Sequence, residues 1–301
     1  MINQTLDLAG GATLTTYVQD SEVGFGRFVN RPAMLICPGG AFLIHATREC
    51  EAVAIEFMRR GFQCFVVRYS VATNRECPER QPEKAAPYPT QLMQLMEAMH
   101  VVTSNAEAWH VDESRMYVMG FSAGGHVAAS LGVRWNDPSL TEKLPFEPVG
   151  DELRPSGVIL GYPMLRFNDG PFAQGLSDEA REQGREVYRF TLGTASPSPS
   201  QLESMDLIPL VGPESAPAFV WNCADDPVID CTAAFDFMRA LLAADVSCEY
   251  HLFSRGGHGQ PLFNGLTMDE DSALDGSLSS WVDLAIAWID SLKSEVLLPD
   301  V

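Results

Sequence analysis

The sequence predicts an α/β fold, with a mainly parallel central sheet covered by helices on both faces. Short runs of apolar, β-branched and aromatic residues alternate along the chain with longer segments in which apolar residues recur at helical spacing. Strands that alternate with helices pair in parallel and are buried on both sides. Two of the predicted strands also run into glycine-rich turns, and in such folds ligands bind at the carboxyl ends of the strands.

The predicted elements follow one another in a regular order. Glycines and basic residues mark helix ends, as where Gly61 follows Arg59 and Arg60. The predicted strands are residues 33–37, 62–69, 115–119, 157–162, 218–222 and 246–253. The predicted helices are residues 49–60, 91–109, 123–133, 232–244 and 278–293.

Length and composition favour a single domain over residues 1–301. Hydrophobic residues make up 46% of the chain and charged residues 20%, an ordinary globular composition with enough apolar material for a large core. Residues 134–156 and 163–216 interrupt the alternation, because both are polar, contain proline and are too long for simple connections. We expect both insertions to cross one end of the sheet and to form walls near the active site.

The net charge of −20 argues against nucleic acid and anionic membranes as partners, because both would repel the protein. The first residues contain no basic segment followed by an apolar stretch, and no apolar run reaches the roughly 18 residues of a membrane helix. The seven cysteines are scattered without a Cys-x-x-Cys pair, which favours reduced thiols in the cytoplasm over disulfides or a zinc site. We therefore expect a cytoplasmic protein. A mature secreted form and a homo-oligomer are left open.

The strongest chemical motif is Gly120-Phe121-Ser122-Ala123-Gly124, which lies between a predicted strand and a predicted helix. This is the context that a G-x-S-x-G nucleophile elbow requires, because the glycines permit a turn that is too tight for side chains. Ser122 is the candidate nucleophile, and the start of the following helix points its free N–H groups at the same place. The alternative is a glycine-rich turn without chemistry, which the strand–turn–helix context disfavours.

A second loop is a candidate for stabilising an oxyanion. Pro38-Gly39-Gly40-Ala41 follows the strand 33–37 and is similar to the HGGG-type loop of esterases, with proline in place of histidine and Ala41 in place of the third glycine. We expect the backbone N–H groups of Gly40, Ala41 and Ala123 to form the oxyanion hole. Alone, Pro-Gly-Gly is a weak signal for a turn.

The candidate base is His258, in a glycine-rich loop after the strand 246–253, since the base follows the nucleophile in this chain order. His251 lies within that strand, opposite in phase to its apolar residues, and is expected on the surface. His126 is expected to pack beneath the elbow, and His45 is a candidate for lining the pocket.

The candidate acid lies in Ala224-Asp225-Asp226-Pro227-Val228, directly after the strand 218–222 and 32 residues before His258. A carboxylate there would hold the imidazole in the required tautomer and stabilise its cationic form. The residues alone leave Asp225 and Asp226 both open. The sequence contains no His-Glu-x-x-His, no Walker loop and no G-x-G-x-x-G after a strand.

The chain resembles the α/β-hydrolase esterase/lipase family, in particular its acetyl-xylan-esterase-like group of carbohydrate-ester hydrolases. CPGGAF, GFQCFVVRYSV, DESRMYVMGFSAGGHVAASLGV, ADDPVID and HLFSRGGHG carry the resemblance, in the family's order, from about residue 33 to 260. The resemblance implies that Asp226, directly before Pro-Val, is the acid of the triad. The departures are Ala41, where glycine is usual, and Ile229-Asp230, where Val-Pro is common.

These observations predict a serine carboxylesterase that forms an acyl-enzyme and needs no cofactor or metal. The expected substrate is a small ester with a short acyl group, acetyl above all, and the alcohol is a candidate carbohydrate. A peptidase of the same fold and a catalytically inactive binding protein are the alternatives.

The preference for short acyl groups is predicted from the insertion 163–216, which is mostly polar. Its main aromatic residues, Phe167, Phe172, Tyr188 and Phe190, suffice to wall a small pocket or stack on a sugar ring but are sparse for a lipid groove. The competing interpretation is that the insertion packs on the sheet or forms a contact between subunits.

Overall fold

The computed structural model describes residues 1–19, 30–73, 86–167, 178–265, 267–268 and 278–292. An eight-stranded sheet has the order β1-β2-β4-β3-β5-β6-β7-β8. The strands are β1 (Thr5–Asp7), β2 (Thr13–Tyr17), β3 (Arg31–Cys37), β4 (Gln63–Arg68), β5 (Val111–Phe121), β6 (Gly157–Gly161), β7 (Ala218–Cys223) and β8 (Cys248–Phe253). The six strands from β3 to β8 pair in parallel, which confirms the predicted fold class.

The two strands at the amino terminus were not predicted. β1 and β2 form an antiparallel pair, and β2 continues antiparallel to β4. Threonines dominate β2, so the segment lacks the apolar run that marks the other strands. β2 is nevertheless buried along its whole length because it lies between β1 and β4. Tertiary position, and not the local pattern, makes these residues a strand.

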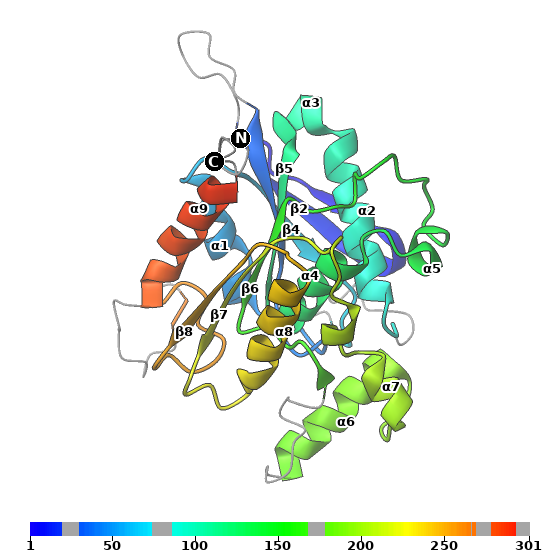
Figure 1. The fold of residues 1–301 in the computed structure, drawn as a ribbon. Coiled ribbons are helices and arrows are strands. Elements are labelled where there is room, and N and C mark those ends of the chain that lie inside the picture. The colour runs from blue at the N-terminus through cyan, green and yellow to red at the C-terminus, as the bar shows by residue number, and fades with distance from the viewer. Residues whose placement is uncertain (20–29, 74–85, 168–177, 266, 269–277, 293–301) are drawn as a thin grey trace.

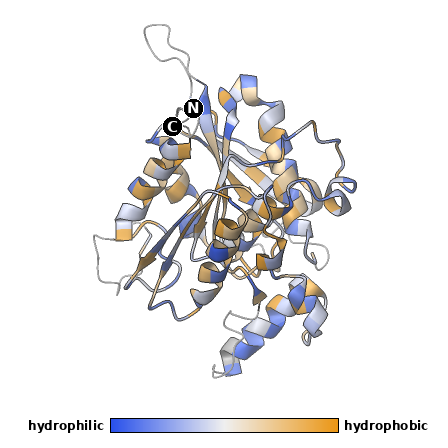
Figure 2. Cartoon of the chain, in the orientation of Figure 1, coloured by the Kyte–Doolittle hydropathy of each residue, from blue (hydrophilic) through white to orange (hydrophobic). Residues whose placement is uncertain are grey.

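Helices cover both faces of the sheet (Figure 1). α2 (Thr90–Ser104), α4 (Ser122–Arg134) and α8 (Thr232–Ala243) pack on one face with strand residues such as Leu35 and Val118. α1 (Glu51–Met58) and α9 (Trp281–Leu292) pack on the other face with Ile36 and Met119. The inner strands β3, β6 and β7 are mainly apolar (Figure 2), because their successive side chains enter two different cores.

The predicted helix 91–109 is two helices, α2 and α3 (Ala106–Trp109). Asn105 separates them with φ −110° and ψ 12°, and its Nδ2 donates a hydrogen bond of 2.7 Å to the Val101 carbonyl. A short amide side chain competes with the helical hydrogen bonds, so the break falls at this residue. The predicted helix 49–60 is shorter at both ends, and a 3₁₀ turn over Thr47–Glu49 precedes α1.

The two insertions lie at different ends of the strands. Residues 134–156 contain α5 (Pro138–Thr141) and lead to the amino end of β6, where Ser156 N–H donates to the Met116 carbonyl. Residues 163–216 contain α6 (Asp178–Leu192) and α7 (Pro199–Glu203), which lie below the sheet in the view of Figure 1. The second insertion is therefore the one placed at the carboxyl ends of the strands, where Ser122 lies.

In the described part of the chain, no helix is both long and apolar enough to cross a membrane.

Candidate active site

Ser122 stands at the sharp turn from β5 into α4, with a left-handed φ of 51°. Glycines make this turn sterically feasible. A Cβ at Gly120 would collide with the Gly124 carbonyl, and a Cβ at Gly124 would collide with the Cys37 carbonyl on β3. Side chains are thus excluded on both sides of the serine, and its hydroxyl is directed to the carboxyl edge of the sheet.

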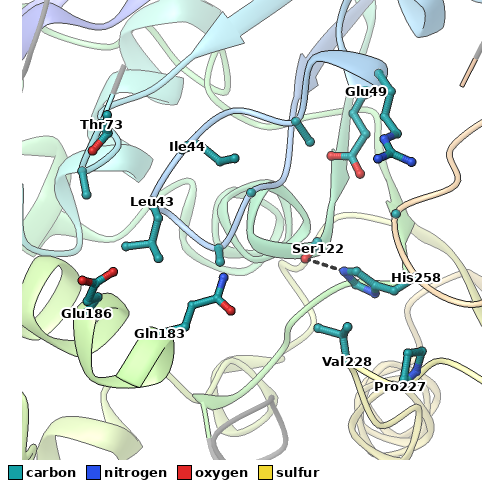
Figure 3. A pocket seen from close by; sticks show the side chains of 16 residues that line it. Leu43, Ile44, Glu49, Thr73, Ser122, Gln183, Glu186, Pro227, Val228 and His258 are labelled. Atoms are coloured by element: carbon teal, nitrogen blue, oxygen red, sulfur yellow. Dashed lines mark hydrogen bonds between the residues drawn. The ribbon is translucent and has the colours of Figure 1, made fainter. Parts of the chain in front are cut away.

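Ser122, His258 and Asp226 form one chain of hydrogen bonds, although they are far apart in the sequence. His258 Nε2 lies 3.0 Å from Ser122 Oγ (Figure 3). On the other side of the ring, His258 Nδ1 lies 2.7 Å from Asp226 Oδ2. Because a carboxylate only accepts hydrogen bonds, Nδ1 carries the proton and Nε2 presents its lone pair to the serine. The arrangement can remove the serine proton and stabilise the resulting imidazolium.

The structure separates the two adjacent aspartates. The side chain of Asp226 is 1% exposed, and its Oδ1 accepts the backbone N–H groups of Val228 and Ile229 while Oδ2 faces His258. Asp225 Oδ1 instead accepts the Gly257 N–H at 2.9 Å. Asp226 therefore contacts the imidazole, and Asp225 ties down the loop that carries it.

The loop after β3 lies beside the serine. Gly40 has φ 118° and Ala41 has φ 56°, so both residues occupy the left-handed region that favours glycine. Ala41, which stands where glycine is usual in the family, therefore adopts a backbone conformation that would strain an alanine more than a glycine. Among the hydrogen bonds between described residues, none uses the N–H of Gly40, Ala41 or Ala123 as a donor. These donors are available at the edge where Ser122 stands.

The hydroxyl of Ser122 opens into a pocket of about 780 Å³. We call Gly40, Ser122 and His258, which line this pocket, together with Asp226, which lies behind His258, the pocket floor. Leu43, Ile44, Pro227 and Val228 supply apolar sides near the floor, and Thr73, Gln183 and Glu186 supply polar ones (Figure 3). We call Gln183 and Glu186, both on α6, the outer wall. Of the two insertions, the described residues of 163–216 reach this pocket and those of 134–156 do not.

The remaining histidines of interest lie outside the pocket. His126 is buried on α4 beneath the elbow, as expected, and its Nε2 lies 3.0 Å from the Met205 carbonyl. Burial lowers the pKa of His126 to about 4, so its imidazole is neutral at pH 7. His45 packs against the Tyr69 ring and does not line the pocket, contrary to expectation. His251, expected on the surface, is half-buried because its ring packs on that of Phe219, with centroids 5.2 Å apart.

The aromatic residues of the insertion 163–216 do not wall the pocket. Phe167 and Phe190 are buried in the core, and Tyr188 packs on Phe167 with ring centroids 5.9 Å apart. Phe172 lies outside the described residues. The described aromatic side chains thus attach the insertion to the sheet, and polar side chains face the pocket instead.

Sequence reasoning missed Glu49, Gln183 and Glu186, which all line the pocket. No motif marks them. Glu49 lies ten residues after Gly39 in the crossover from β3 to β4, and burial raises the pKa of its carboxyl. Gln183 and Glu186 stand four residues before the buried Val187 and Phe190, so they flank the buried side of α6, and helical periodicity alone does not mark them as pocket residues.

The parallel sheet, the elbow and the Ser-His-Asp chain together define an α/β hydrolase. The sequence matches the α/β-hydrolase-fold family over residues 34–262, and the chain belongs to this family. The matched region contains Ser122, Asp226 and His258.

Comparisons with individual proteins agree with this assignment. The chain is 30% identical over 249 residues to Endo-1,4-beta-xylanase B of Butyrivibrio fibrisolvens, covering 82% of this chain and 34% of that protein. It is 22% identical over 232 residues to an acetylxylan esterase of Xylanibacter ruminicola, covering 75% of this chain and 40% of that protein. The chain spans between 34% and 54% of the length of these curated relatives and of esterase LipC of Mycobacterium tuberculosis.

Among solved structures, a carboxylesterase from Lactobacillus plantarum superposes with a TM-score of 0.77 at 28% sequence identity, and the match covers 99% of both chains.

Proposed function

We propose that this protein is a serine carboxylesterase that hydrolyses short acyl esters, acetyl esters above all, of carbohydrate alcohols. The observation that carries the proposal is the 3.0 Å contact between His258 Nε2 and Ser122 Oγ, made at the floor of an open pocket and backed by Asp226. Family membership and the likeness to a carboxylesterase and an acetylxylan esterase support it.

The proposed mechanism has two acyl-transfer steps. His258 Nε2 takes the proton of Ser122 Oγ as the oxygen attacks the ester carbonyl, and the N–H groups of Gly40, Ala41 and Ala123 stabilise the oxyanion. When the intermediate collapses, the carbon–oxygen bond to the alcohol breaks and His258 returns the proton to the leaving oxygen. Water then attacks the acyl-enzyme with His258 as base, and the free acid and Ser122 are regenerated.

The sides of the pocket support the proposed substrate class. Among the described residues of the insertion, Phe167 and Phe190 are buried in the core and polar side chains of α6 face the pocket, so the outer part of the pocket offers a long acyl chain no aromatic groove. Gln183, Glu186 and Thr73 offer hydrogen-bond partners that suit the hydroxyl groups of a sugar.

The test is kcat/KM for p-nitrophenyl esters from two to ten carbons, together with acetate release from acetylated xylo-oligosaccharides. We expect a maximum at two to four carbons, and at least a ~10-fold lower value at eight carbons. A maximum at eight carbons or longer would contradict the short-acyl preference. An aminoacyl p-nitroanilide tests the peptidase alternative, and failure of a fluorophosphonate to label Ser122 would support an inactive binding protein.

A further inference from the structure

Glu49 is an acidic side chain buried within the candidate active site. It is 2% exposed and lines the same pocket as Ser122 and His258. Figure 3 shows its carboxyl group directed toward the Ser122–His258 pair. A buried carboxyl group is costly unless hydrogen bonds compensate it, so its position calls for a specific set of partners.

One carboxylate oxygen holds the loop that carries the candidate oxyanion donors. Glu49 Oε2 accepts the N–H of Gly39 at 2.5 Å. Gly39 directly precedes Gly40 and lies against the serine, since a Cβ at Gly39 would stand 2.9 Å from Ser122 Cβ. The hydrogen bond therefore sets the position of the loop relative to the serine.

The other oxygen reaches the histidine through a tyrosine. Glu49 Oε1 accepts the Tyr162 hydroxyl at 2.8 Å, and the Tyr162 ring meets the His258 ring edge-on with centroids 4.8 Å apart. Tyr162 is fully buried, with a left-handed φ of 36°. A bulky residue keeps such a backbone conformation only where its surroundings fix it, and the bond to Glu49 is one of those constraints.

We infer that Glu49 is a positioning residue that holds the oxyanion loop, through Gly39, and His258, through Tyr162, in register with Ser122. Burial raises the pKa of the Glu49 carboxyl, whereas the Tyr162 hydroxyl, the Gly39 N–H and the nearby His258 and Arg48 act in the opposite direction. Both oxygens accept hydrogen bonds, which is the pattern of a carboxylate.

The test compares Glu49→Gln, Tyr162→Phe and the double variant in the full chain with p-nitrophenyl acetate as substrate. Enzyme concentrations are set by stoichiometric fluorophosphonate labelling, so loss of folded protein does not count as loss of turnover. We expect Glu49→Gln to lower kcat by about 10- to 100-fold, with KM within about threefold of wild type, because misplacement of reacting groups acts on the chemical step. Tyr162→Phe should lower kcat less.

The double variant decides whether the two residues act through one contact. If they do, its kcat equals that of Glu49→Gln alone, and a loss equal to the product of the two single losses overturns the inference. A kcat within about twofold of wild type in Glu49→Gln also overturns it. If Glu49→Gln does not fold, Tyr162→Phe keeps the ring against His258 and removes only the hydroxyl, so an unchanged kcat in that variant is the overturning result.

Glu152→Gln is the matched control. It removes a carboxylate that also contacts a histidine, His100 at 2.7 Å, but in the insertion at the other end of the strands, so kcat should not change. The inference rests on the proposed esterase function, and the two fail differently. If the proposed function is wrong, wild type itself releases no acid from esters. If only the inference is wrong, wild type and Glu49→Gln turn over equally.

Discussion

The pocket floor and the outer wall are held in place by different kinds of contact. The floor residues stand at strand ends where the backbone is closely packed, and a Cβ added at Gly40 would collide with the Ile44 carbonyl. The outer wall stands on α6, which is buried along one side through Val187 and Phe190 and exposed along the other. The floor therefore admits little variation, whereas the wall can change its side chains without disturbing the core. In the proposed function the floor carries out the reaction and the wall selects the alcohol.

Removing the Ser122 hydroxyl is expected to cause the largest loss of activity among the floor variants. Because covalent catalysis needs this oxygen, Ser122→Ala should lower kcat by about a million-fold. The free energy of unfolding should stay within about 1 kcal/mol, since the hydroxyl contributes little packing. Ester turnover by the purified variant and chemical denaturation measure the two effects. Retention of more than a small fraction of the activity would show that the floor does not act through Ser122.

The paired aspartates give the next largest effect. Asp226→Asn should lower kcat by about ten-thousand-fold, because an amide Nδ2 facing Nδ1 favours the wrong tautomer of His258. Asp225→Asn is the matched control, since its remaining oxygen still accepts the Gly257 N–H. Steady-state kinetics of the two variants are sufficient. A crippled Asp225→Asn beside an active Asp226→Asn would reverse the assignment.

The floor could be predicted from the sequence almost residue by residue, and the wall could not. Gly120 and Gly124 are demanded by a backbone collision, so the motif around Ser122 carries its own geometry. The strands from β3 to β7 were also predictable, since each contains an apolar run that is buried in the sheet, and the edge strand β8 was predictable from its alternation of apolar and polar residues. β1 and β2 were not predictable, because β1 is a short, largely exposed edge strand and the burial of β2 comes from its neighbouring strands and not from its own composition.

The lining of the pocket depends on which face of a helix meets which loop, and local patterns do not encode this. The aromatic residues of 163–216 gave the stronger chemical signal, yet Phe167 and Phe190 are buried in the core and the polar Gln183 and Glu186 line the pocket. Glu49 was missed for a related reason, because its role depends on contacts with Gly39 and Tyr162 that lie 10 and 113 residues away.

The pH dependence of stability at His126 tests whether water reaches the packing beneath the pocket floor. The His126 ring contacts the Met205 carbonyl and so connects the floor with the insertion 163–216. Burial lowers its folded-state pKa from 6.5 to about 4, so between these values the unfolded chain binds the proton and the folded one does not. Stability therefore falls as pH drops through this window. Between pH 7.5 and 5, wild type should lose about 2 kcal/mol more free energy of unfolding than His126→Gln.

Denaturant titrations of both proteins at the two pH values measure this difference, and the other titrating groups cancel because the two chains share them. An equal loss in wild type and His126→Gln would mean that the imidazole is reached by water or protons in the folded state.

The smallest effect is expected at the outer wall, where the comparison is sharpest. Gln183→Ala and Glu186→Ala should each raise KM for an acetylated xylo-oligosaccharide by about 3- to 10-fold, the value of one hydrogen bond to a sugar hydroxyl. Both should leave kcat/KM for p-nitrophenyl acetate within about twofold of wild type, because that substrate has no hydroxyl groups for the wall to bind.

Glu182→Gln is the matched control, because Glu182 lies on the same helix, pairs with Arg185 and Arg189, and does not line the pocket. If the wall variants slow both substrates equally, α6 positions the floor and does not select the alcohol. If they change neither, the sugar contacts lie elsewhere and the proposed carbohydrate specificity loses its structural basis.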